Sequence, residues 1–132
     1  MRYRLLTLLL VLGTLTAIAK DGNEKQAYVF GFATSFMDSV VYVTPIQTLS
    51  PVKWLPRTHL LDQRKVYSEQ MRYYLNNQNL TDRTIVVFWD KKRKNVEKRW
   101  QKLKKRYTQK LHYEWKEIGA EAFQFKVPSA EE

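Results

Sequence analysis

The sequence predicts an α+β fold, a two-layer sandwich in which a mixed sheet of four or five strands carries two helices on one face. Three observations predict it: apolar residues alternate with period two early in the chain, two later stretches have helical periodicity, and a short β-branched run separates them. The expected order is strand, strand, helix, strand, helix, strand, with one more C-terminal strand left open. Because crossovers between strands of one sheet are right-handed, we expect both helices on the same face.

Strict alternation predicts the first strand over residues 27–36, and its aromatic side consists of Tyr28, Phe30, Phe32 and Phe36. Residues 37–39 are expected to turn into a second strand at 40–44, whose pairing ends at Pro45 because proline has no N–H to donate. The small residues on the other side of the first strand allow a helix to approach closely. The aromatic side needs a cover of its own, which is the final strands, a second copy in a homodimer or a bound partner.

The remaining elements follow in order. Apolar residues at helical spacing predict a helix from Thr58 to about Asn77. The run 85–89 is short, apolar and rich in β-branched residues, which is typical of a central strand buried on both faces. Asp90 is placed to cap the N-terminus of a second helix over 91–110. Alternation at 111–116 and 123–127 predicts one or two closing strands.

The N-terminus has the three-part layout of a secretory signal peptide. Arg2 and Arg4 precede an apolar run over 5–15, and the small residues of 17–19 follow it. Cleavage after Ala19 predicts a signal peptide at 1–19 and a single α+β domain at 20–132, exported to the periplasm or secreted. An uncleaved anchor is the alternative, but the apolar stretch is shorter than the roughly 17–25 residues that span a bilayer. We expect no transmembrane helix after cleavage.

Charge and cysteine content limit the function classes. The absence of cysteine excludes disulfides, a cysteine nucleophile and a lipoprotein anchor, and in an exported domain it favours a bacterial source. The whole chain has a net charge of +10, and segment 91–110 alone carries eleven Lys and Arg residues with the single acid Glu97. Basicity therefore belongs to one element rather than to the protein as a whole.

The expected basic helix is the strongest candidate for a binding site. Its apolar stripe consists of Val96, Trp100, Leu103 and Tyr107, and the candidate anion-binding residues opposite it are Lys91, Lys94, Lys98, Lys102 and Lys105. Like charges at this spacing repel by about 0.2–0.5 kcal/mol per pair, and an anionic partner relieves that repulsion. The preferred hypothesis is an exported, non-enzymatic envelope protein that binds an anionic polymer, a lipid headgroup or an acidic protein. A solvated face that keeps the protein soluble is the alternative.

Catalytic and metal-binding patterns are sparse. The second hypothesis is an exported hydrolase or nuclease that uses His59 or His112 with nearby carboxylates, Asp62 and Glu114. No third ligand stands at a diagnostic spacing, so we expect neither a metal nor a cofactor. The stretch 29–33 only partly matches the ribonucleoprotein signature, and no specific nucleic acid is expected as a partner.

Three stretches also carry a resemblance to other proteins: residues 31–42, residues 83–88 and the Lys/Arg-rich segment that follows them. They resemble small uncharacterised exported proteins of Bacteroidetes-type bacteria, over most of the chain after residue 19. The resemblance implies export and a single domain, and it brings no activity, cofactor or site residue.

Overall fold

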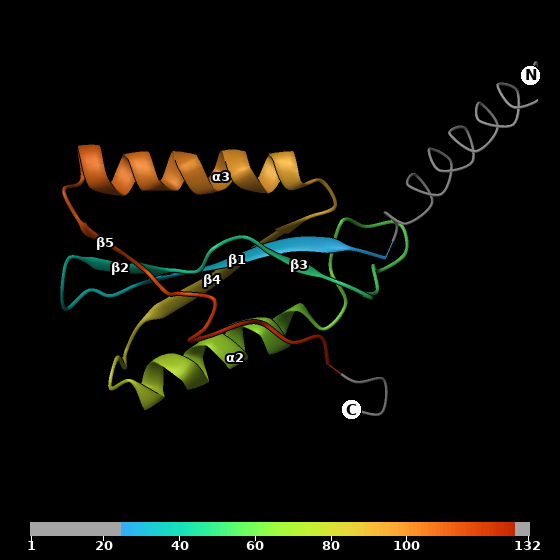
Figure 1. Ribbon diagram of the computed structural model, residues 1–132, viewed down its shortest axis with the longest axis horizontal. Coiled ribbons are helices and arrows are strands. Elements are labelled where there is room, and N and C mark those ends of the chain that lie inside the picture. Colours follow the sequence, from blue (N-terminus) through green and yellow to red (C-terminus); the bar gives the residue numbers. More distant parts are fainter. Residues whose placement is uncertain (1–24, 129–132) are drawn as a thin grey trace, which may run out of the picture.

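The computed structural model describes residues 25–128 and shows three layers (Figure 1). A five-stranded mixed sheet lies in the middle, with α2 (Arg64–Asn77) on one face and α3 (Arg93–Lys105) on the other. The α+β class, the mixed sheet and the order of the main elements are confirmed. The expected signal peptide at residues 1–19 lies outside the described residues.

The central strand of the sheet is β1 (Ala27–Thr34). One of its edges pairs antiparallel with β4 (Thr84–Asp90) along nearly its whole length. The other edge is shared by β2 (Val40–Val43) and β3 (Gln47–Leu49), both antiparallel to β1, and β5 (Glu114–Glu117) runs parallel to β2. Strand β3 is not among the elements predicted from the sequence, and it resumes pairing with β1 after the chain passes Pro45.

The alternation of β1 places its side chains in two separate cores. Ala27, Val29 and Ala33 pack with the buried residues of α2, whereas Phe30 and Phe32 pack with α3. Gly31 lies on the α2 side, where an added Cβ would lie 2.3 Å from the Met71 sulfur. The close helix approach on the small side is thus confirmed. The expectation of an exposed aromatic sheet face available for a homodimer is wrong, because α3 covers that face.

The placement of both helices on one face, as a two-layer sandwich, is also wrong (Figure 1). The connection through α2 leads from β3 across β1 to β4, and the connection through α3 returns from β4 across β1 and β2 to β5. Connections of the same hand that cross a sheet in opposite directions put their helices on opposite faces. The order of elements does not reveal this reversal, because it depends on which edge of β1 receives β4.

The first helix begins later than expected, at Arg64 rather than Thr58. The Thr58 hydroxyl donates to the Leu55 carbonyl and accepts from the Leu60 amide, so it stabilises a turn in place of a helical start. A bridge between Trp54 and Leu61 closes this loop. His59 and Asp62 therefore precede α2 and do not stand one turn apart on a helix.

The strand β4 is an edge strand rather than a central one. Within residues 25–128 it pairs only with β1, and of its seven residues only Val87 is buried. Its apolar composition reflects the two cores that it helps to cover, with Ile85 and Trp89 on the α2 side and Phe88 on the α3 side. A run of five apolar residues does not by itself show whether a strand lies at the edge or in the centre of a sheet.

The chain after β5 does not form the second closing strand. Residues 123–127 cross α2 in an extended conformation (Figure 1), and glutamine side chains hold their backbone. Gln47 donates to the Phe125 carbonyl and accepts from its amide, at 2.6 and 2.8 Å. Gln70 makes the same pair of bonds with Lys126, at 2.8 and 2.9 Å. The alternation at 123–127 thus reflects burial of Phe125 against α2, without pairing to a strand.

One ion pair fixes the turn between β1 and β2. The Arg83 guanidinium, whose side chain is 5% exposed, contacts the Asp38 carboxylate at 2.5 Å and donates to the Val40 carbonyl. Desolvation by burial tends to raise the pKa of Asp38, but the hydrogen bonds from Arg83 and Val40 and the charge of Arg83 outweigh it. The pKa of Asp38 is therefore lowered.

We expect Asp38→Asn to reduce stability at pH 7 by about 1 kcal/mol, the upper end of the range for exposed pairs, because the Asp38 carboxylate is exposed but the Arg83 side chain is buried. A carboxyl whose pKa is lower in the folded state stabilises the fold above its unfolded pKa, and this contribution disappears as the pH falls through the folded pKa. The difference between wild type and variant should thus be full at pH 7 and shrink over the range below the ordinary Asp pKa of about 3.9. Urea unfolding across that range measures it, and a pH-independent difference contradicts the role of the carboxylate.

Candidate anion-binding site

Two residues, Lys91 and Lys92, separate the end of β4 from the start of α3. The Asp90 carboxylate accepts from the Lys92 amide at 2.8 Å and from the Asn95 side-chain amide at 3.2 Å. Lys92 occupies the N-cap position of α3, so Asp90 orders the turn before the helix and is not the N-cap that the sequence predicts. After Lys105 the chain continues as one π-helical turn, η1 (Arg106–Lys110), which the Arg106 carbonyl closes by accepting from the Leu111 amide.

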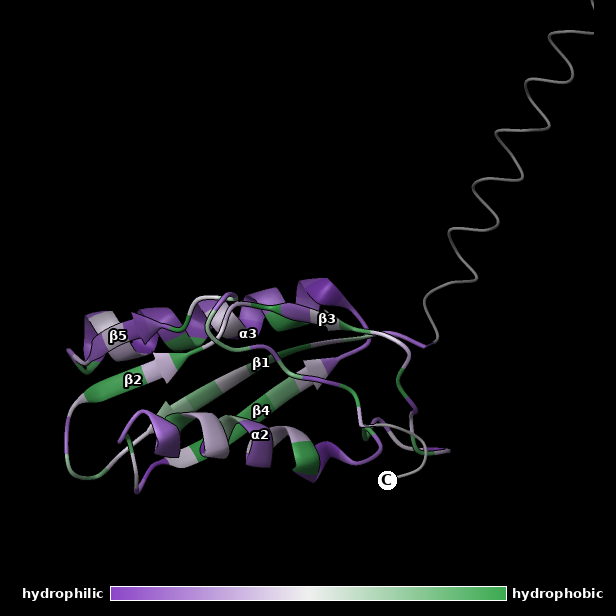
Figure 2. Ribbon diagram, turned by 60° about the horizontal axis from the view of Figure 1, so that its bottom comes forward, coloured by the Kyte–Doolittle hydropathy of each residue, from purple (hydrophilic) through white to green (hydrophobic). Residues whose placement is uncertain are grey.

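The apolar stripe of this segment packs on the sheet as expected. Val96 is buried, and Trp100, Leu103 and Tyr107 contact the core that contains Phe32. The Trp100 indole N–H donates to the Thr44 carbonyl at 3.0 Å. The Tyr107 ring lies edge-on to Phe32 with centroids 5.0 Å apart. These contacts fix the rotation of the helix on the sheet. Most of the α3 ribbon has the colour of hydrophilic residues (Figure 2).

All five lysines of the expected stripe, Lys91, Lys94, Lys98, Lys102 and Lys105, are exposed. The structure does not bring them together as one site. Lys102 and Lys105 line a surface cavity at the C-terminal half of α3, whereas the other three are not among its lining residues. Lys91 instead lies over the Trp54 ring, 5.1 Å from its centroid.

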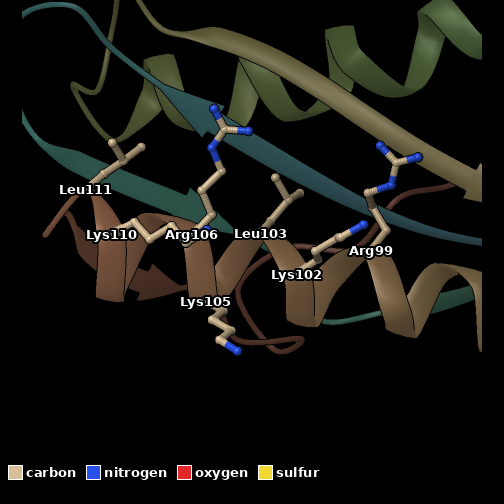
Figure 3. A pocket seen from close by; sticks show the side chains of 7 residues that line it. All are labelled: Arg99, Lys102, Leu103, Lys105, Arg106, Lys110 and Leu111. Atoms are coloured by element: carbon tan, nitrogen blue, oxygen red, sulfur yellow. The ribbon is translucent and has the colours of Figure 1, made fainter.

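The cavity at the C-terminal half of the segment, about 860 Å³ in volume, is the candidate site (Figure 3). We call it the basic groove, and its lining residues are Arg99, Lys102, Leu103, Lys105, Arg106, Lys110 and Leu111. Arg99, Leu103, Arg106 and Leu111 extend from one side of the helix, while Lys105 points away from them (Figure 3). Five cations thus line a groove that also contains two apolar side chains.

The charges on the two flanks of α3 differ in their surroundings. Toward β5, Lys104 lies 3.5 Å from the Glu117 carboxylate and 5.3 Å from the Trp100 ring centroid. Toward β4, the Arg99 guanidinium lies 5.3 Å from the Phe88 ring centroid. The ion pairs formed within residues 25–128 include none of the five cations of the basic groove. The groove cations therefore keep their positive charge without an ion pair in the described part of the chain, as Lys94 and Lys98 outside the groove also do.

Arg99, Arg106 and Lys110 are not among the candidate residues predicted from the sequence. The signal was present, because Arg99, Lys102, Arg106 and Lys110 are spaced by three, four and four residues, which keeps them on one side of a helix. This side lies next to Leu103 rather than opposite the apolar stripe. The choice of the opposite side assumed that charges turn as far from the core as possible, whereas long basic side chains also lie along its border.

The two histidines are exposed and lie in separate loops. His59 precedes α2, where its carbonyl accepts from the Trp89 indole, and His112 follows η1 with φ of 57°. His112 is not part of β5, so it does not share a strand with Glu114 as expected. Neither histidine lines the basic groove. Among the described residues, no three metal-ligating side chains come together.

None of the helices in the described part of the chain has the length and apolar character needed to cross a bilayer. Comparisons with protein-family models, curated protein sequences and solved structures found no match to this chain.

Proposed function

We propose that this protein is an exported, non-enzymatic envelope protein that binds an anionic partner through the basic segment 91–110, with the basic groove as the contact surface. One observation carries the proposal: five cations gather around a single groove on one helix, and none of them has an ion-pair partner within residues 25–128. Clustered like charges destabilise one another, and a multivalent anion removes that repulsion.

The rigidity of the helix supports this proposal. The apolar stripe is packed against the sheet and the Trp100 indole is hydrogen-bonded to Thr44, so the groove cations project from a fixed backbone. A surface that is ordered before binding loses less conformational entropy when the partner arrives.

The location is part of the proposal and rests on the sequence of residues 1–19. A positive head, an apolar run and a small-residue exit favour cleavage after Ala19 and export. The partner would then be an anion of the envelope or of the medium, such as a phosphate-bearing lipid or an acidic polymer. Mass spectrometry of protein from its native host tests this, because an intact Met1 on a cytosolic species contradicts export.

Retention on immobilised phosphate polymer tests the binding. We expect the chain that begins at Lys20 to elute well above 0.15 M salt, where the screening length is about 8 Å. The groove variant K102Q/R106Q/K110Q should elute at distinctly lower salt. If each lost cation removes one phosphate contact, the log–log salt slope should fall by roughly 0.7–0.9 per contact.

A matched control comes from the same helix. The variant K91Q/K94Q/K98Q removes the same charge from exposed lysines outside the groove, and we expect it to shift elution by less than half as much. An equal shift from both variants overturns the groove as the contact surface. Elution of the wild-type chain below 0.15 M salt overturns anion binding altogether and leaves the helix as a solubility face.

A further inference from the structure

The turn between β1 and β2 exposes two large apolar side chains at adjacent positions. Phe36 is 101% exposed and Met37 is 85% exposed. Isolated apolar residues are common on protein surfaces, but a full pair at the tip of a hairpin presents a continuous apolar protrusion. Neither side chain contributes to the two cores of the domain.

The backbone of this turn is held by polar residues on either side of the apolar pair. The Ser35 hydroxyl accepts from the Met37 amide at 3.0 Å, and the Asp38 carboxylate accepts from the Val40 amide at 3.2 Å. Asp38 is itself fixed by Arg83, whose side chain is 5% exposed. The turn is thus built without Phe36 and Met37, and these side chains are free to contact a partner.

The apolar tip lies at the same end of the molecule as the basic groove. In Figure 1 and Figure 2 the β1–β2 connection and the C-terminal end of α3 occupy the same end. The Ser39 carbonyl in the turn accepts from the Glu114 amide at 2.9 Å, which joins the turn to the chain just after η1. Leu111 in the groove is 45% exposed and adds a third apolar group.

We propose that this end of the molecule docks on an anionic phospholipid bilayer, with Phe36 and Met37 entering the headgroup region and the groove cations contacting lipid phosphates. The inference rests on the proposed function and names its partner. A soluble polyanion has phosphate or carboxylate groups but no apolar phase, so it leaves the tip exposed to water. A bilayer interface takes up apolar side chains and concentrates anions next to them.

The composition of the groove agrees with this partner. Leu103 and Leu111 lie among its cations, so the groove itself combines apolar contact with positive charge. Basic residues near an anionic membrane surface each contribute a gain of roughly fivefold in binding. Stable peripheral attachment generally needs two such signals together, charge and an inserted apolar group.

Vesicle co-sedimentation tests the inference. The protein is the chain that begins at Lys20, which keeps every sheet pairing and both cores because these are formed by residues 27–127. The vesicles are pure phosphatidylcholine or phosphatidylcholine with about one third phosphatidylglycerol. We expect binding to the anionic vesicles and a loss of at least tenfold in the tip variant F36S/M37S, from the lost burial of two large apolar groups.

Matched controls separate the tip and the groove from surface changes in general. Leu60 and Tyr73 are also exposed apolar residues, and L60S/Y73S should bind vesicles as the wild type does. The groove variant K102Q/R106Q/K110Q should lose on the order of a hundredfold. The variant R64Q/K65Q/R72Q removes the same charge from α2 and should lose less than fivefold. Circular dichroism checks that each variant keeps its fold.

The outcomes distinguish the two proposals. A tip variant that is retained on phosphate polymer like the wild type but released from vesicles supports the membrane inference. If the wild type is retained on the polymer yet ignores anionic vesicles, or if F36S/M37S binds them unchanged, the membrane inference is overturned and anion binding stands. If the wild type binds neither polymer nor vesicles, both proposals are overturned.

Discussion

Replacement of Phe30 by alanine is expected to lower the free energy of unfolding by about 3–5 kcal/mol. The Phe30 side chain is fully buried between β1 and α3, and its ring stacks on Phe88 with centroids 4.9 Å apart. Removal of the ring loses its transfer free energy and leaves a cavity that the packed neighbours fill only in part. A typical domain has about 5–15 kcal/mol of stability, so the loss is a large fraction of the total.

Urea unfolding at a constant m-value measures this effect. The matched control is Phe36→Ala, which removes the same side chain from a position that is 101% exposed. Substitutions at such surface positions change stability by about 0.5 kcal/mol or less. Equal losses at Phe30 and Phe36 would contradict the packing of α3 on the aromatic side of β1.

Replacement of Gly31 by alanine is expected to cost about 1–3 kcal/mol, although alanine usually suits a strand better than glycine does. The added Cβ would lie 2.3 Å from the Met71 sulfur and 2.9 Å from the Phe125 ring carbon Cζ. Both neighbours are buried, so neither has free space into which it can move. The glycine is thus required by the approach of α2 and of the C-terminal segment to the sheet.

Two comparisons check the cause of this loss. Gly119→Ala places its Cβ against the carboxylate of exposed Glu121, which can turn into solvent, so we expect a change within about 0.5 kcal/mol. In the second comparison, Met71→Ala should relieve the clash, so the double variant G31A/M71A loses less stability than the two single variants together. Strictly additive losses would show that Gly31 and Met71 are not in steric contact.

Phe30 and Gly31 are neighbouring residues of β1, and the sequence alone predicts that they have different surroundings. Period-two alternation reveals that Phe30 and Gly31 face opposite sides of the sheet, and that the side with Gly31 admits a close neighbour. It does not reveal what covers the aromatic side. That answer depends on which edge of β1 accepts β4, a long-range pairing for which no local pattern exists in the chain.

Other misses have local chemical causes. Apolar spacing predicts the start of α2 at Thr58, but the Thr58 hydroxyl binds nearby backbone groups and stabilises a turn there instead. The residues 123–127 alternate as a strand does, yet Gln47 and Gln70 satisfy their backbone in place of a ladder. Side-chain capture of this kind depends on residues about 56 and 78 positions away.

The candidate site was found in part. The sequence indicates that segment 91–110 is basic and which stripe faces the core, and both follow from composition and helical period. The grouping of its charges does not follow, because it depends on neighbours from other elements. Glu117 of β5 neutralises one flank through Lys104, and the other flank keeps its charge. The pattern predicts Phe36 as part of the first strand, because alternation continues two residues past the end of β1 at Thr34.

The C-terminal segment that Gln47 and Gln70 bind stabilises only one of the two cores of the protein. Four amide hydrogen bonds and the burial of Phe125 hold this strap, and no rung of the sheet depends on it. Cleavage by a protease in this segment would expose the α2 side of the sheet first, because Phe125 would no longer cover Gly31. The α3 side of the sheet packs in a separate core that contains no residue of the C-terminal segment.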